Sequence, residues 1–148
     1  MDQIECALNR YREGFSCSQS IFSAFTEQFG LPVETALKIA APFGGGMARM
    51  GETCGAVTGA FMVIGLAHGH TTVKDQELKE ETYRLVNEFV SQFKARNGSI
   101  KCRELIAYDM CTPEKLQQAN ESGVFDTVCP RLVKDSAEII SMLIKNRL

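Results

Sequence analysis

The chain has no excess of charge of either sign and no basic cluster. Its 148 residues include 16 Lys and Arg against 18 Asp and Glu, which gives a formal net charge of -2. Proteins that bind nucleic acid or acidic membrane surfaces gather basic side chains on one face or in one run. Here the basic residues are scattered along the sequence, so we expect neither nucleic acid nor a membrane as a partner.

Long apolar runs and targeting signals are also missing. A membrane-spanning helix needs about 20 apolar residues, and the longest uncharged apolar stretch, Cys54 to Ala67, is shorter. The opening residues MDQIECALNRYREG lack the positive start and apolar core of a signal peptide. We therefore expect a cytoplasmic protein. Because that compartment is reducing, its six cysteines are expected to be packing residues, metal ligands or redox thiols rather than structural disulfides.

The familiar short motifs of redox and metal sites do not occur. There is no CxxC, so a thioredoxin-like dithiol or a zinc ribbon is not indicated by local spacing. There is also no HExxH, no P-loop lysine pattern, no GxGxxG after a strand, and no CxxCH for covalent haem. Any site made of cysteines must therefore combine residues that lie far apart in the sequence.

No stretch alternates between polar and apolar residues as a half-buried strand does. The apolar residues instead recur at helical spacing between breakers such as Gly14, Gly30, Pro42 and Gly98, and the length suits one domain over residues 1–148. The fold class is therefore predicted to be all-α. The predicted helices cover residues 3–12, 16–29, 32–41, 54–67, 72–96, 99–106 and 113–122, and a last one runs from Cys129-Pro130 to the C-terminus.

The segment from Cys54 to Ala67 is expected to be the centre of a compact multi-helix bundle. It carries no charge, and Thr58 is its one clearly polar side chain, so a helix here would be apolar all round and belongs in an interior. Gly51, Gly55 and Gly59 recur at every fourth position, which leaves one face with little side-chain bulk. Other helices can approach such a face closely, and it could also serve a contact in a homo-oligomer.

Four of the six cysteines fall at predicted helix starts. Cys17, Cys54, Cys102 and Cys129 begin the second, fourth, sixth and eighth helices. If short loops make successive helices antiparallel, every second helix points the same way, and the four starts lie at one end of the bundle. We therefore predict that these four thiols share one site, as catalytic residues and as metal ligands. Cys6 and Cys111 do not fit this pattern and are treated as incidental.

Helix starts suit a cluster of sulfur anions. The unpaired N–H groups and the positive end of the helix dipole favour a thiolate over a thiol, and metal ions, iron–sulfur clusters and exchanging dithiols all require deprotonated sulfur. The nearby loop is rich in glycine, whose backbone N–H groups can face a cluster, a phosphate or another anion, and an arginine there adds positive charge. The candidate cofactor-binding residues are Gly44, Gly45, Gly46, Arg49, Gly51 and Gly55.

Each of these features also has a simpler interpretation. Cysteine is among the most buried residue types, so any one of the four could be a packing residue. The glycines could form a tight turn that allows close packing, and Arg49 could be a solvated surface charge. His68 and His70 cannot share a helical face, and a histidine near a helix C-terminus favours a surface capping role over metal ligation.

The order of the cysteines resembles a known family. Cys17, the segment Cys54-Gly55-Ala56-Val57-Thr58-Gly59, Cys102 and Cys129 together are similar to the C_GCAxxG_C_C family of small bacterial and archaeal proteins, over nearly the whole chain. The family label writes Gly-Cys-Ala where this chain reads Cys-Gly-Ala. The resemblance implies four characteristic cysteines suspected of redox chemistry or of holding a prosthetic group such as an iron–sulfur cluster. Some relatives carry twin-arginine export signals, which this chain lacks.

Two hypotheses of different classes follow. The first is a redox-active protein, a small oxidoreductase or electron carrier with an unidentified redox partner, whose four cysteines hold an iron–sulfur cluster, hold zinc, or work without metal as exchanging thiols. The second is a helical module that binds a ligand or a partner and uses its cysteines only for packing. The sequence leaves the choice between cluster, zinc and dithiol open, because spacing along a chain gives no distances in space.

Overall fold

The computed structural model describes residues 2–145, and the only β-type pairing within them is an isolated bridge between Thr53 and Lys101. The all-α prediction is confirmed. The elements are α1 Gln3–Glu13, α2 Cys17–Phe25, η1 Glu27–Phe29, α3 Val33–Ala40, η2 Ala41–Phe43, α4 Gly44–Met47, α5 Gly55–His68, α6 Gln76–Asn97, α7 Cys102–Ile106, α8 Pro113–Ser122, α9 Val124–Thr127 and α10 Cys129–Lys145.

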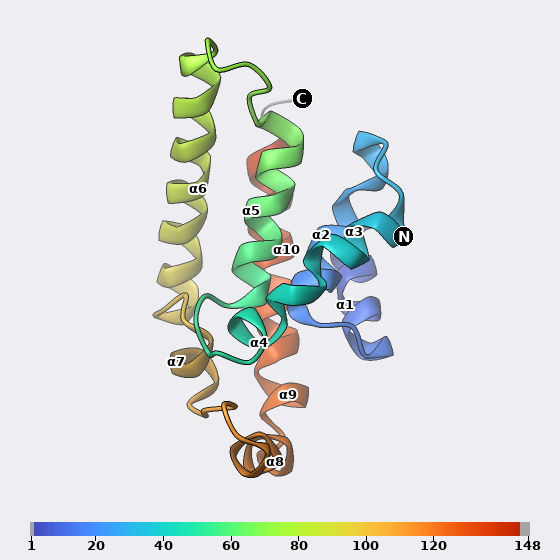
Figure 1. The fold of residues 1–148 in the computed structure, drawn as a ribbon, viewed down its shortest axis with the longest axis vertical. Coiled ribbons are helices and arrows are strands. Elements are labelled where there is room, and N and C mark those ends of the chain that lie inside the picture. The colour runs from blue at the N-terminus through green and yellow to red at the C-terminus, as the bar shows by residue number, and fades with distance from the viewer. Residues whose placement is uncertain (1, 146–148) are drawn as a thin grey trace.

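Helix α5 occupies the middle of the arrangement (Figure 1). It packs against α2, α10 and α6, while α3 packs against α2 and α1 packs against both α2 and α10. Helices α5 and α10 run in the same direction, and α6 returns in the opposite one. The first residues of α5 and α10 therefore lie at the same end of the bundle, where α4, α7 and α9 also gather.

The face of α5 that carries Gly55 and Gly59 packs against α2 of the same chain. A Cβ atom added to Gly59 would lie 2.9 Å from the carbonyl oxygen of Ser18 and 3.0 Å from Cβ of Ile21, both on α2. Those distances are shorter than ordinary van der Waals contact, so a glycine is needed where α2 crosses. The predicted close helix approach is confirmed at this position.

Burial of α5 is complete only over its first part. Residues 55–60 are buried, as are Val63 and Ile64, but Gly65 is exposed and Leu66 is 37% exposed. The expectation that the whole helix lies in the interior is wrong for its last turn, because that end extends past α1 to α3 and is covered on fewer sides (Figure 1).

Two buried serines tie the helices together around the start of α5. The Ser136 hydroxyl on α10 donates a hydrogen bond of 2.7 Å to the carbonyl of Ala56, and the Ser18 hydroxyl on α2 donates one of 2.9 Å to the carbonyl of Ala40. Both hydroxyls are fully buried and both are paired, so they cost little in desolvation. The Ser136 bond fixes α10 beside the start of α5, and the Ser18 bond fixes α2 against the end of α3.

Several helix boundaries in the structure differ from the predicted ones. The helix expected over residues 16–29 ends at Phe25, because the Thr26 carbonyl accepts from both Phe29 and Leu31 and closes a tighter turn. The helix expected to begin at residue 72 begins at Gln76, because the Asp75 carboxylate accepts from the backbone N–H of Leu78 and caps α6 there. Ser99 does not cap α7, whose N-cap is Lys101.

Two further structural results concern short and apolar segments. The four-residue helix α9, Val124–Thr127, was not predicted, since one turn is too short to show a period of 3.6 residues. Across the described part of the chain, none of the helices combines the length and the apolar character that crossing a bilayer requires.

Candidate four-cysteine site

The four cysteines at helix starts line one cavity of about 110 Å³. Cys17 is the first residue of α2, Cys54 is the N-cap of α5, Cys102 is the first residue of α7, and Cys129 is the first residue of α10. The predicted meeting of these four residues is confirmed. Their assignment as catalytic residues or metal ligands stays a prediction.

The position of Cys17 follows from the cap of α2. The Ser16 hydroxyl accepts from the backbone N–H of Gln19, and the Gln19 side chain accepts from the backbone N–H of Ser16. This reciprocal capping box fixes the first turn, so the next residue, Cys17, is held at the positive end of the helix.

Cys54 and Cys102 are brought together by a short backbone pairing. The N–H of Cys54 donates to the carbonyl of Ile100 at 2.7 Å, and the N–H of Cys102 donates to the carbonyl of Glu52 at 2.6 Å. The segments just before α5 and α7 therefore lie side by side in antiparallel fashion. Cys54 and Cys102, which are 48 positions apart in the sequence, therefore begin two neighbouring helices. No pattern in the sequence predicted this pairing.

The glycine-rich loop makes a left-handed turn against Cys102. Gly45, Gly46, Met47, Ala48 and Arg49 all have positive φ, between 50° and 69°. Left-handed geometry costs an L-residue about 1–2 kcal/mol, so three of these residues are strained. A Cβ atom on Gly46 would lie 2.6 Å from Cβ of Cys102. The loop backbone therefore rests directly on the cysteine, which is possible only at glycine.

The walls of the cavity are mainly apolar. Besides the cysteines and the glycines, the lining side chains are Tyr11, Ser16, Ile106, Met110, Phe125 and Leu132. At Gly55, an added Cβ would lie 2.8 Å from the backbone nitrogen of Ser18 and 3.2 Å from Cβ of Cys17. Because such a surface limits water, charged sulfur inside the cavity depends on nearby donors and counter-ions rather than on solvent.

Burial dominates the acid–base behaviour of two of the thiols. It raises the pKa of Cys54 to about 12, although the backbone N–H groups of Ala56 and Val57 at the start of α5 act in the opposite direction. Burial and the nearby Cys129 raise the pKa of Cys102 to about 11. In the metal-free site these two residues are therefore neutral thiols at physiological pH.

Cys129 behaves differently because it accepts hydrogen bonds. The Cys17 thiol and the Tyr11 hydroxyl both favour its thiolate, and its pKa is lowered despite burial. The pKa of Cys17 is raised, first by this same hydrogen bond to Cys129 and then by burial. The Tyr11 hydroxyl also lies 2.6 Å from the carbonyl oxygen of Phe125, so its single proton has two acceptors. Cys129 is thus the most acidic thiol of the four.

A preformed site for a single metal ion is not found. Within residues 2–145, no group of three or more His, Cys, Asp or Glu side chains is placed to hold one ion. In a mononuclear zinc site every sulfur lies about 2.3 Å from the metal, so the sulfurs must be nearly in contact. The four thiols surround a cavity instead and are free of disulfides in the described part of the chain.

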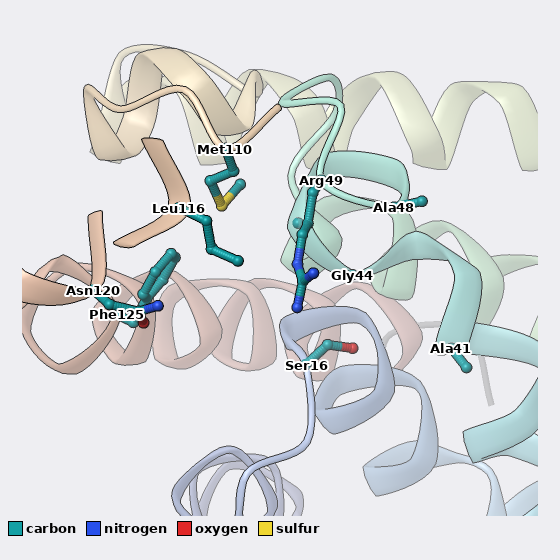
Figure 2. A pocket seen from close by; sticks show the side chains of 10 residues that line it. Ser16, Ala41, Gly44, Ala48, Arg49, Met110, Leu116, Asn120 and Phe125 are labelled. Atoms are coloured by element: carbon teal, nitrogen blue, oxygen red, sulfur yellow. The ribbon is translucent and has the colours of Figure 1, made fainter. Parts of the chain in front are cut away.

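The six candidate cofactor-binding residues divide into three groups. Gly45, Gly46 and Gly55 line the thiol cavity. Gly44 and Arg49 line an adjoining pocket of about 520 Å³, shown in Figure 2, and Gly45 belongs to both. Gly51 lines neither, and its carbonyl accepts from the backbone N–H of Arg103 at the start of α7. That residue supports the loop rather than facing a ligand.

The remaining cysteines and histidines lie away from the cavity. Cys6 is half-buried on α1 and Cys111 is exposed after α7. His68 ends α5; it is half-buried, its Nε2 atom has no hydrogen-bond partner among the described residues, and burial lowers its pKa. His70 is exposed. Tyr11, Met110 and Phe125 were missed by sequence reasoning, because nothing in their local pattern separates a cavity wall from ordinary core.

A comparison with protein families gives a match over most of the chain. The sequence profile of a family described as "Putative redox-active protein (C_GCAxxG_C_C)" matches residues 15–143, a span that contains all four cavity cysteines and excludes Cys6. Neither the curated proteins nor the solved structures contain a match to the chain.

Proposed function

The chain belongs to the C_GCAxxG_C_C family, and from this we propose that its four cavity cysteines form one redox centre that holds an iron–sulfur cluster. Cys17, Cys54, Cys102 and Cys129 would be the ligands. Four cysteine thiolates are the usual protein ligands of both [2Fe–2S] and [4Fe–4S] clusters.

The main support for this proposal is the cavity that the four cysteines line. Protein interiors are close-packed, and voids larger than a water molecule are few. The cavity of about 110 Å³ that the four cysteines help to line exceeds the share of about 30 Å³ that one water takes in the liquid. Thiols used only for packing would be expected to fill such a space, whereas ligands of a group containing several atoms must surround it.

The residues present fit a cluster better than a single zinc ion. Several iron atoms spread their four cysteine ligands more widely than one ion does, which agrees with the absence of a mononuclear group within residues 2–145. A bound cluster would supply one-electron transfer. The backbone N–H groups of Ala56 and Val57 act on the Cys54 sulfur, and the Tyr11 hydroxyl acts on the Cys129 sulfur. Such hydrogen bonds stabilise the anionic ligands and set the reduction potential.

Metal analysis of protein purified without oxygen tests this proposal. We expect brown protein that contains iron and acid-labile sulfide in similar amounts. Colourless protein that takes up neither after anaerobic incubation with iron and sulfide would overturn the cluster. Stoichiometric zinc, with unfolding by chelator, would show a structural metal site instead.

A second candidate, an exchanging thiol pair, is favoured by the hydrogen bond between Cys17 and Cys129. In this chemistry the Cys129 thiolate attacks one sulfur of an oxidised disulfide partner, a mixed disulfide forms, and the partner's other sulfur leaves as a thiolate. Cys17 then loses its proton and attacks Cys129, which releases the reduced partner and leaves a Cys17–Cys129 disulfide. Two electrons pass from the chain to the partner.

Mild oxidation of the metal-free protein distinguishes this pair. We expect peptide mapping to find Cys17 linked to Cys129 as the first disulfide, because the Cys17 thiol already donates a hydrogen bond to Cys129. The link should disappear in Cys17→Ser and persist in Cys6→Ser. A first disulfide that joins Cys54 to Cys102, or that involves Cys111, would contradict the pairing.

A further inference from the structure

The pocket of about 520 Å³ adjoins the thiol cavity. The two spaces share Ser16, Gly45, Met110 and Phe125 as lining residues. These shared residues, which come from the α2 cap, the glycine loop and the segment between α7 and α10, border both the outer pocket and the space lined by the four cysteines. Its volume lies within the range of about 300–1,000 Å³ that is typical of small-molecule sites.

Arg49 is the one charged side chain among the ten that line this outer pocket. Figure 2 shows it reaching across the pocket toward Ser16, with Met110, Leu116 and Phe125 on the opposite wall. Among the described residues its guanidinium takes part in no ion pair, and no acidic residue lines the pocket. Arg49 is exposed, so solvent reaches its guanidinium, and because no acidic residue lines the pocket its charge is available to an anionic group.

The loop that positions Arg49 has a strained backbone. Arg49 has a φ of 68°, and the two residues before it, Met47 and Ala48, also have positive φ. At Gly45, an added Cβ would lie 3.0 Å from Cγ of Arg49 and 3.6 Å from Cε of Met110. Gly45 thus leaves room for the side chains of Arg49 and Met110. Backbone strain of this kind concentrates at functional sites.

The geometry points to Arg49 as the anchor of a small organic anion, whose charged group lies in the outer pocket and whose apolar end faces the thiol cavity. Asn120, exposed on the pocket rim, and Ser16 supply further polar contacts. The inference rests on the proposed redox centre for its purpose, since an anion bound here is the substrate or electron partner placed next to the cysteines. Binding itself requires only the pocket.

Two thiol-reactive disulfides, one anionic and one neutral, test the inference on full-length, reduced, metal-free protein. Dithiobis(nitrobenzoate) is an anionic aryl carboxylate, and dithiodipyridine is neutral. In each reaction a site thiolate attacks one sulfur of the probe, a mixed disulfide forms, and the aromatic thiolate leaves. The measurement is made with Cys6→Ser and Cys111→Ser in place, so that only the four cavity thiols react.

The measured quantity is the reaction rate with the anionic probe divided by the reaction rate with the neutral probe. We expect Arg49→Gln to lower this ratio by about tenfold, which is the effect of losing one charged hydrogen bond. Added salt should reduce the ratio for the parent and leave that of Arg49→Gln nearly unchanged. Arg84→Gln, which removes an equal charge from exposed α6, is the matched control and should keep the parent ratio.

An equal ratio in Arg49→Gln and the parent would overturn the inference, as would an equal fall in Arg49→Gln and Arg84→Gln. Iron content separates this result from failure of the proposed function. Arg49→Gln should retain the iron of the wild type, because Arg49 does not line the thiol cavity. A parent without iron that still shows the Arg49-dependent ratio would retain the anion pocket and reject the cluster.

Discussion

Replacement of Gly46 by alanine should lower the free energy of unfolding by about 2–5 kcal/mol, the sum of left-handed strain and overpacking. The φ of Gly46 is 64°, and its added Cβ would lie 2.6 Å from Cβ of Cys102 and 2.7 Å from the backbone nitrogen of Glu52. Neither neighbour is the end of a flexible side chain. The backbone pairing that places Cys102 beside Cys54 must therefore shift, and denaturant unfolding measures the loss.

Gly123→Ala is the matched control for this change. Gly123 also has positive φ, at 80°, but nothing lies within 4 Å of an added Cβ. It isolates the backbone strain, which should cost about 1–2 kcal/mol and leave the cysteine site intact. Equal destabilisation by the two substitutions would show that Gly46 is needed only for its positive φ. That result would contradict a close contact between the loop and Cys102.

Alkylation of the metal-free protein by iodoacetamide at pH 8 should modify Cys129 at least about 30-fold faster than Cys54. A thiol reacts as its thiolate, so its rate rises with pH until the pKa is passed. The pKa of Cys54 is about 12, whereas that of Cys129 lies below its usual 9.0. At least three pKa units correspond to about a thousandfold difference in thiolate fraction, and the greater nucleophilicity of the more basic thiolate reduces this to about 30-fold.

The rate is read for each cysteine by peptide mass spectrometry at low extents of modification. In denaturant the two residues should react alike, which controls for intrinsic differences. Tyr11→Phe should raise the pKa of Cys129 toward its usual value, because the variant lacks the hydroxyl that stabilises the thiolate. Comparable rates for Cys54 and Cys129 in the folded protein would contradict the hydrogen-bonding asymmetry of the site.

Local sequence signals were sufficient to predict the longer helices and the starts of α2 and α10. The capping box of Ser16 with Gln19, the glycine at position 14 and the proline at position 130 act within one turn, so they can be recognised without the rest of the fold. That Cys17 and Cys129 begin helices follows from these signals. The alternation of helix direction then predicted the shared site, because α5 and α10 run in the same direction.

Features that depend on tertiary contact could not be predicted. The pairing of Cys54 with Ile100 and of Cys102 with Glu52 joins two loops through backbone groups, which carry no residue-specific signal. The left-handed turn includes Met47, Ala48 and Arg49, residues whose own preference is for negative φ. The role of Tyr11 depends on its distance from Cys129 and Phe125, and helical periodicity marks it only as part of an amphipathic face.

In the function proposed above, four cysteines act as one redox centre and the other two take no part. The sharpest test is the content of iron and acid-labile sulfide per chain, measured without oxygen in the six single Cys→Ala variants. We expect a loss of the iron and sulfide of the wild type in each of Cys17→Ala, Cys54→Ala, Cys102→Ala and Cys129→Ala, and retention of both in Cys6→Ala and Cys111→Ala. Full retention of iron and sulfide in any of the first four variants, or their loss in either of the last two, would contradict the proposal.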